Sequence, residues 1–255
     1  MTWRWAAASV AGTSHAATGQ PCQDACCVRL LSSHDGDGVL GVFVADGAGS
    51  ARHGGEGAEA AVHAAAMFWA ERLAAPHSSI DASSMGLCVE AIRARLGTLA
   101  DERGVPVREC ACTFVSVLAS STEVVTFQVG DGGVVLDLGD GYLVATKPMT
   151  GEYANTTYFI TESEDRISEG EAIWHGAPAR RISVFTDGLQ RLALDHSLGQ
   201  ANPRFFDRRF ATLEAASPGQ KDQIEPALAA FLACEAINRH TDDDKTLVLA
   251  SVVSE

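Results

Sequence analysis

The chain has 255 residues, of which 46% are hydrophobic and 20% charged, a composition typical of a globular protein with a sizeable core. Its formal net charge of −14 argues against the cationic surface that binds nucleic acid or anionic membranes, so we expect neither as a partner. No apolar run reaches the roughly 20 residues of a membrane helix, and residues 1–11 lack a signal-peptide pattern. The seven cysteines form no Cys-x-x-Cys pair, which is typical of reduced thiols in a cytoplasmic protein.

In chain order, the hydrophobic pattern predicts blocks of strands and helices. Strands are expected at residues 3–10, 25–31 and 39–45, with a polar loop at 15–23, and helices at 56–73 and 85–100. A meander of short strands then follows at residues 113–118, 123–129, 134–137 and 142–145.

Residues 147–181 are irregular, with one expected strand at 157–161, and such a long excursion is often a functional loop. The remaining elements are a strand at 182–186, helices at 205–213 and 223–238, and a strand at 246–253. No repeat or linker interrupts this pattern. The prediction is therefore one domain, residues 1–255, of the α+β class with a layered sandwich architecture.

Three strand-like stretches lead directly into an Asp-Gly pair, and a fourth acidic cluster precedes the last strand. These positions are Asp46-Gly47, Asp131-Gly132, Asp187-Gly188 and residues 242–244. Glycine after each Asp lets the backbone turn sharply and approach an ion. Hard divalent cations prefer carboxylate, carbonyl and water oxygens, so the pattern indicates a metal site built at strand ends.

Two other interpretations of these patterns are open. Asp-Gly is a common turn dipeptide, and a hairpin turn explains any single pair, whereas three pairs in one chain favour a shared site. Soft-metal binding by Cys26 and Cys27, or by Cys110 and Cys112, is the weaker alternative. Alternate positions of a strand would place Cys110 and Cys112 on one face as small core residues.

The ordered motifs carry a family resemblance. The segments are residues 12–15 (GTSH), 19–24 (GQPCQD), 43–50 (FVADGAGS), 111–114 (ACTF), 128–132 (QVGDG), 185–189 (FTDGL) and 242–246 (DDDKT). Together they resemble the metal-dependent (type 2C) serine/threonine protein phosphatases, in particular a bacterial branch. The resemblance implies an α-β-β-α sandwich, in which two antiparallel sheets are flanked by helix pairs. It also implies a binuclear magnesium or manganese site at one end.

The resemblance assigns roles to residues of this chain. Asp46 resembles the carboxylate that bridges both metal ions, and the Gly47 carbonyl a backbone ligand. Asp187 and Asp243 would hold one ion, because residues 243–246 match the family's Asp-Asn-x-Thr/Ser. Asp24 resembles an outer-sphere carboxylate that positions metal-bound water. Asp131 would form a third, weaker site with Asp187.

Two positions depart from the family pattern. Gly19 stands where many members have a phosphate-binding Arg, and Ala48 where animal members often have a His. His15, Arg52 and His53 are the nearest substitutes in sequence. For His15, a catalytic role as proton donor or phosphate ligand stands beside a structural role as a loop cap.

The resemblance implies hydrolysis of phosphoserine and phosphothreonine in proteins by a metal-activated water, with Asp24 and Asp46 as catalytic residues. We add His15 as a catalytic candidate, because its loop leads directly to Asp24. Its partners would be a phosphorylated protein substrate and a cognate Ser/Thr kinase. The missing Arg favours an alternative, a pseudophosphatase that binds phosphoproteins or regulates them. A small-molecule phosphatase is a third reading.

Overall fold

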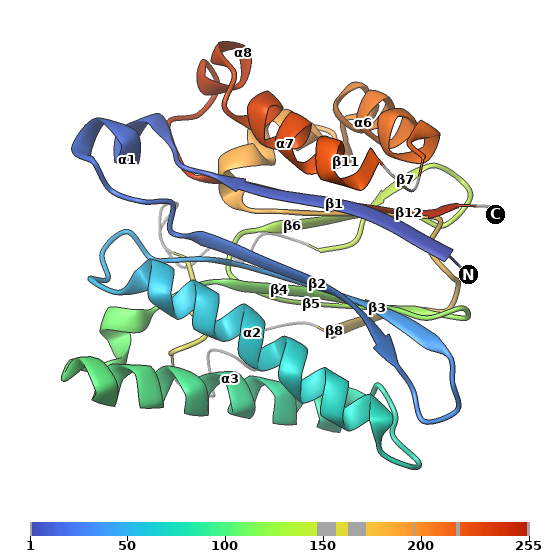
Figure 1. The fold of residues 1–255 in the computed structure, drawn as a ribbon, viewed down its shortest axis with the longest axis horizontal. Coiled ribbons are helices and arrows are strands. Elements are labelled where there is room, and N and C mark those ends of the chain that lie inside the picture. Colours follow the sequence, from blue (N-terminus) through green and yellow to red (C-terminus); the bar gives the residue numbers. More distant parts are fainter. Residues whose placement is uncertain (1, 147–156, 163–171, 196, 218–219, 254–255) are drawn as a thin grey trace.

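The structure is a computed structural model that describes residues 2–146, 157–162, 172–195, 197–217 and 220–253. Two antiparallel sheets lie face to face, and helices cover the outer face of each (Figure 1). The α-β-β-α sandwich expected from the sequence is therefore confirmed. Among the described helices, none combines the length and the apolar character of a membrane span.

Each large sheet has five strands. The first contains β1 (Thr2–Val10), β12 (Lys245–Val253), β9 (Arg181–Phe185), β6 (Gly133–Asp137) and β7 (Tyr142–Val144), in that order. The second contains β2 (Asp24–Ser32), β3 (Gly38–Asp46), β4 (Phe114–Ala119), β5 (Val124–Val129) and β8 (Ala172–His175). A separate short pair joins β10 (Leu194–Asp195) to β11 (Gln200–Ala201).

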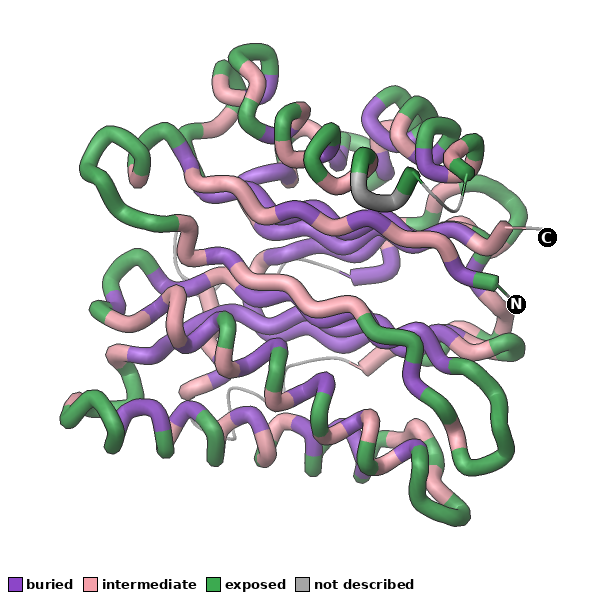
Figure 2. Tube along the Cα trace, in the orientation of Figure 1, coloured by how far each residue is buried: buried purple, intermediate pink, exposed green. Residues whose placement is uncertain are grey.

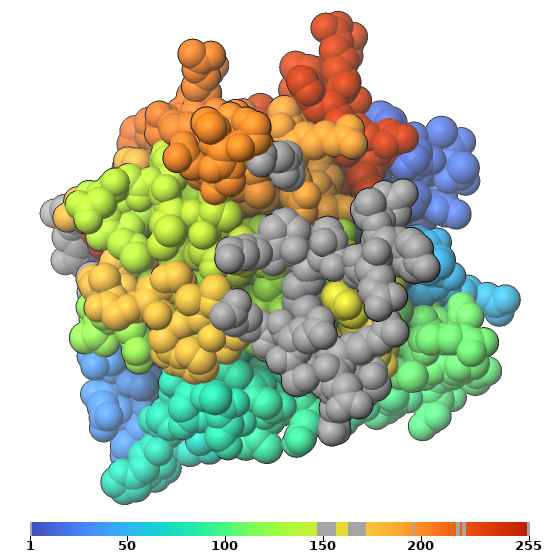
Figure 3. Space-filling view, turned by 180° about the vertical axis from the view of Figure 1, so that it is seen from behind, coloured from blue at the N-terminus to red at the C-terminus, as the bar shows by residue number. Residues whose placement is uncertain are grey.

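The helices form the two outer layers. The second sheet is covered by α2 (Gly54–Ala74) and α3 (Ala82–Arg103), and the first by α6 (Pro203–Ala215) and α7 (Lys221–Leu232) (Figure 1). On the opposite side of the molecule, the surface carries β7 and β8 between these two helical layers (Figure 3). Short helical turns connect the layers: α1 (Thr13–Thr18), η1 (Val107–Cys110), η2 (Asp187–Leu189), α5 (Gln190–Ala193) and α8 (Glu235–Asn238).

Apolar side chains fill the space between successive layers, as the burial pattern shows (Figure 2). On β3, Val42 and Val44 pack against the other sheet, whereas Phe43 and Ala45 pack toward α2 and α3. Successive side chains of a strand point to opposite faces. A strand covered on both faces therefore needs apolar residues throughout, which explains the uninterrupted run at residues 39–45.

The structure corrects three sequence predictions. Residues 15–23 are not simply a loop, because they include most of α1, which has no buried residues and so gives no hydrophobic period. The predicted strand at 157–161 is wrong: Thr157 forms only an isolated bridge, and residues 158–161 are in no strand. The predicted helix at 223–238 is two helices, because Cys234 is extended between them. The rest of residues 147–171 lies largely outside the described residues.

Two smaller features also differ from expectation. β8 was not predicted, although it adds the last strand of the second sheet. Cys110 lies in η1 and Cys112 in an isolated bridge rather than in one strand, but both are buried as expected. All seven cysteines are free thiols.

The α2–α3 layer provides a test of the core. Trp69 is fully buried on α2, whereas Met67 on the same helix is 59% exposed. Trp69→Ala removes the indole from a close-packed site, so we expect urea denaturation to show a loss of about 3–5 kcal/mol in the free energy of unfolding. The control, Met67→Ala, should change it by less than about 0.5 kcal/mol. Similar losses for both variants would contradict this packing.

Candidate metal centre

The β2–β3 hairpin brings two of the predicted carboxylates together. Asp24 is the first residue of β2 and Asp46 the last residue of β3, and the antiparallel register places them directly opposite each other. Asp46 lies two residues after Val44, whose side chain points between the sheets, and Asp24 shares that face because it is the direct cross-strand partner of Asp46. The two carboxylates therefore face the gap between the sheets, at the end of the sandwich that carries α1 (Figure 1).

Hydrogen bonds tie Asp24 to the other sheet. The hydroxyl of Thr186, which follows β9, donates to Oδ2 of Asp24 at 2.7 Å. Oγ1 of Thr186 in turn accepts a hydrogen bond from the backbone N–H of Thr246 on β12 at 3.0 Å. Asp24 is only 8% exposed, and its position is thus set by both sheets at once.

The backbone around Asp46 is fixed by the segment before β4. The N–H of Asp46 donates to Oγ1 of Thr113 at 3.0 Å, and the Asp46 carbonyl accepts from the N–H of Thr113 at 2.8 Å. Gly47 is buried, forms a bridge with Cys112, and donates its N–H to the carbonyl of Gln23 at 3.1 Å. This turn carries the backbone carbonyl proposed as a ligand.

Three further carboxylates share the electrostatic environment of Asp46. Burial raises the pKa of Asp46 well above its usual value, and the charges of Asp24, Asp187 and Asp243 raise it further. Burial likewise raises the pKa of Asp187 to about 6, with contributions from Asp131 and Asp243. The structure thus brings all five predicted acidic residues to one end of the sandwich.

The pKa values of Asp24 and Asp131 are also raised. Burial raises the pKa of Asp24 to about 7, although hydrogen bonds from Thr186 and Thr246 oppose the shift. Burial also raises the pKa of Asp131, which a hydrogen bond from Thr157 partly opposes. Uncompensated negative charge is therefore the common property of the cluster, and a cation is the group that would relieve it.

The donor set fits a magnesium or manganese ion. Oδ1 of Asp24 and Oδ1 of Asp187 are buried without a hydrogen-bond partner, so each has a free lone pair for a cation. Among the described residues, no three carboxylate, imidazole or thiolate side chains are already arranged to hold one ion. A magnesium-type ion needs only one or two carboxylates, because it keeps several waters, whereas zinc favours His and Cys ligands.

In the last acidic cluster, the structure separates the roles of neighbouring residues. Asp243 is exposed and acts on Asp46, Asp131 and Asp187. Asp244 is 2% exposed, and its carboxylate accepts hydrogen bonds from backbone N–H groups. This division is consistent with the match of residues 243–246 to the family's Asp-Asn-x-Thr/Ser, in which Asp243 takes the metal position and Asp242 is a loop charge. Sequence reasoning missed Asp244, and its only signal was an acid where the family has Asn.

His15 and Gly19 both belong to α1. Nδ1 of His15 lies 2.9 Å from Oδ1 of Asp244, but the angles are not those of a hydrogen bond. Gly19 ends the helix with a φ of 71°, where its N–H donates to the carbonyl of Ala16 and the N–H of Gln20 donates to the carbonyl of His15. This left-handed conformation favours glycine. Gly19 is therefore explained by the helix end rather than by the loss of a phosphate ligand.

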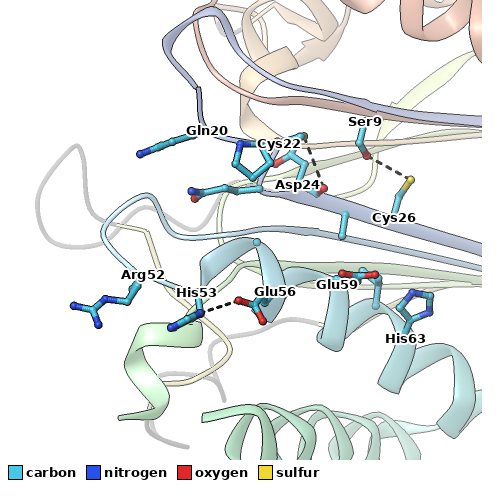
Figure 4. Close-up of a pocket in the computed structure, with 15 residues that line it drawn as sticks. Ser9, Gln20, Cys22, Asp24, Cys26, Arg52, His53, Glu56, Glu59 and His63 are labelled. Carbon is cyan, nitrogen blue, oxygen red and sulfur yellow. Dashed lines mark hydrogen bonds and ion pairs between the residues drawn. The ribbon is translucent and has the colours of Figure 1, made fainter. Parts of the chain in front are cut away.

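A cavity of about 650 Å³ lies beside Asp24. One wall is the segment 20–26, and the other is the loop and first turns of α2 (Figure 4). Arg52 lines the mouth, and no described residue forms an ion pair with it, whereas Nδ1 of His53 bonds to Oε1 of Glu56 at 2.8 Å. Among the described residues, Arg52 thus has no competing ion pair, whereas His53 has one through Nδ1.

Comparison with known proteins decides the family. A sequence model of the family described as Protein phosphatase 2C matches residues 11–233. The chain is also 42% identical over 250 residues to the curated Serine/threonine-protein phosphatase 3 of Escherichia coli (strain K12), covering 98% of each chain. The chain belongs to the protein phosphatase 2C family.

Solved structures share the fold of this family member. The catalytic domain of the serine/threonine protein phosphatase PstP, in complex with 2 manganese ions, matches with a TM-score of 0.62 at 17% identity, covering 99% of both chains. The S. agalactiae serine/threonine phosphatase matches with a TM-score of 0.61 at 17% identity, covering 98% of this chain and 100% of that one. At such identities the likeness establishes the two-sheet sandwich.

The buried carboxylates predict an unusual pH dependence of the metal-free protein. Asp24 and Asp187 bind their protons more tightly when folded than in the unfolded chain, where Asp has a pKa of about 3.9. The stability that these two groups contribute is thus fully present below that value and is lost as pH rises through about 6 and about 7. Thermal unfolding in a chelator should show the melting temperature decreasing across this range.

Two variants separate this effect from general charge repulsion. Asp187→Asn should flatten the decrease, because it removes one of the raised groups. Asp140→Asn, at an exposed turn position, should leave the slope unchanged. A melting temperature that rises with pH in the metal-free wild type would show that these carboxylates are not destabilised by burial.

Proposed function

We propose that this protein is a metal-dependent phosphatase that hydrolyses phosphoserine and phosphothreonine in proteins. The observation that carries the proposal is the convergence of Asp24, Asp46, Asp187 and Asp243 at one end of a protein phosphatase 2C fold. The curated relative named as a serine/threonine-protein phosphatase supports the same substrate class. We also propose that residues 1–255 act as one domain, since β1 and β12, near the two chain ends, pair along their length.

The proposed cofactors are two Mg²⁺ or Mn²⁺ ions, with a third, weaker site. Asp46 would bridge the two ions, Gly47 would contribute its carbonyl, and Asp187 with Asp243 would complete one ion's protein ligands. Asp24 would act through water, and Asp131 with Asp187 would form the third site. PstP, a solved relative in fold, is in complex with two manganese ions.

Bound divalent ions supply a water of lowered pKa and neutralise phosphoryl oxygens. The protein contributes the rest. Thr113 fixes the backbone of Asp46, and Thr186 fixes the carboxylate of Asp24, which limits the reorganisation needed when substrate arrives. Because Asp24 is largely shielded from solvent, it lies in a region of low dielectric, which strengthens its action on charged groups nearby.

The physiological setting follows from the same chemistry. The substrate would be a phosphorylated protein, and a cognate Ser/Thr kinase would supply it by the reverse modification. The net charge of −14 and the reduced cysteines fit a cytoplasmic protein with neither nucleic acid nor membrane as a partner. Arg52, which lines the cavity beside Asp24 and has no ion-pair partner among the described residues, is our candidate cation for the substrate phosphate.

The alternative function is a pseudophosphatase that binds or regulates phosphoproteins. The observation in its favour is Gly19, at the position of the family's phosphate-binding Arg. The conformation of Gly19 weakens this argument, because the helix end accounts for the glycine. A manganese-dependent assay on a phosphorylated peptide separates the two functions.

The first functional prediction concerns the bridging carboxylate. Asp46→Asn should lower turnover by about 10²-fold or more, because it removes the carboxylate proposed to hold the metal ions that neutralise the phosphoryl oxygens. The metal-free variant should be at least as stable as the wild type, since the substitution relieves repulsion. Steady-state kinetics and thermal unfolding of the metal-free proteins measure these two effects, and calorimetric titration with manganese measures the accompanying loss of metal affinity.

Asp35→Asn is the matched control, because Asp35 is exposed at the opposite end of the same β2–β3 hairpin. It should change neither metal affinity nor turnover. Unchanged manganese affinity and turnover in Asp46→Asn would rule out Asp46 as a bridging ligand.

The second functional prediction concerns His15 as a proton donor. A general acid matters for a poor leaving group such as the serine alkoxide and little for an aryl phosphate. His15→Ala should therefore slow hydrolysis of a phosphopeptide about 10²-fold while leaving an aryl phosphate nearly unaffected. Equal losses on both substrates would instead indicate a phosphate ligand or a structural role.

A further inference from the structure

Asp244 is a buried carboxylate that the proposed metal centre does not use directly. Its Oδ1 accepts a hydrogen bond from the backbone N–H of Gly12, and its Oδ2 accepts one from the N–H of Gln23, each at 2.6 Å. His15 adds a ring nitrogen 2.9 Å from Oδ1. Both oxygens are thus occupied by groups that precede β2, more than 200 residues away in sequence.

These contacts join the segments that carry the proposed metal ligands. Gln23 immediately precedes Asp24, and Asp243 immediately precedes Asp244. The backbone of the cluster is packed equally tightly, because a Cβ on Gly188 would lie 2.1 Å from the carbonyl oxygen of Asp244. The turn that follows Asp187 therefore has to rest on the backbone of Asp244.

The other side of this segment is also fixed. A Cβ on Gly12 would lie 2.3 Å from the carbonyl oxygen of Asp242, and the N–H and hydroxyl of Ser14 both donate to that same oxygen. Lys245, which is fully buried, donates from Nζ to the carbonyl of Asp243 at 3.1 Å. Asp244 thus lies at the centre of a rigid junction between the chain before β2 and the chain before β12.

We propose that Asp244 is a positioning residue whose two-sided carboxylate sets Asp24 and Asp243 at the separation that the metal centre requires. The proposal rests on the proposed function for its effect on turnover, but its effect on geometry and metal binding is independent of the reaction. The carboxylate itself holds no metal ion and touches no substrate in this assignment.

The chemistry of the site requires an acid rather than an amide at this position. An ionised carboxylate offers acceptors on both oxygens, whereas Asn offers one oxygen and a donating NH₂ group. In Asp244→Asn, the NH₂ group faces the N–H of either Gly12 or Gln23. One buried N–H donor is then left without an acceptor, which lowers the stability of the folded protein.

The experiment compares Asp244→Asn with Asp242→Asn. The control removes the same charge two residues away, from an exposed side chain. In the metal-free proteins, amide hydrogen exchange of Gly12 and Gln23 should be protected in the wild type and in the control, and at least tenfold faster in Asp244→Asn. This measurement needs neither metal nor activity.

Manganese titration and kinetics on an aryl phosphate complete the test. We expect Asp244→Asn to lose about 10–100-fold in manganese affinity and about 10²-fold in kcat, with a smaller change in KM. Unchanged manganese affinity in a folded Asp244→Asn variant would overturn the proposal. Fast exchange of both amides in the wild type would also overturn it, even if the variant does not fold.

The outcomes distinguish this proposal from the proposed function. A wild type that binds manganese without hydrolysing phosphoesters would refute the phosphatase. A loss of manganese affinity in Asp244→Asn, but not in Asp242→Asn, would still support Asp244 as a positioning residue.

Discussion

Repulsion among buried carboxylates is the constraint on which this end of the molecule depends. Burial and mutual charge raise the pKa values of Asp24, Asp46, Asp131 and Asp187 together. Such a cluster persists because hydrogen bonds from Thr186 and from the backbone hold the groups in place. A fold that concentrates negative charge in this way favours the binding of cations, because their binding free energy offsets the repulsion among the carboxylates.

The sandwich makes that concentration possible. Its two sheets place strand ends from both halves of the chain at one edge, while apolar layers on each side keep the strands rigid. Asp24 and Asp46 come from one sheet, and Thr186 and Thr246 from the other. The geometry of the site therefore depends on the distance between the sheets. Residues that fix this distance affect the site as the proposed ligands do.

Much of this arrangement could be read from the sequence, because long apolar strands and Asp-Gly pairs leave clear local patterns. The short helix α1 left none, since it buries no side chain and is held through its glycine end and Asp242. The role of Asp244 was equally hidden: its partners are backbone N–H groups far away in sequence. β8 follows residues with no regular pattern and is defined by pairing with β5.

Diffraction from crystals soaked in manganese, recorded with the anomalous signal of the metal, tests the central claim most directly. The account predicts two strong peaks on either side of the Asp46 carboxylate, one of them also within coordination distance of Asp187 and Asp243. An ordered crystal of the same form, with manganese bound only at other places or not at all, would contradict it.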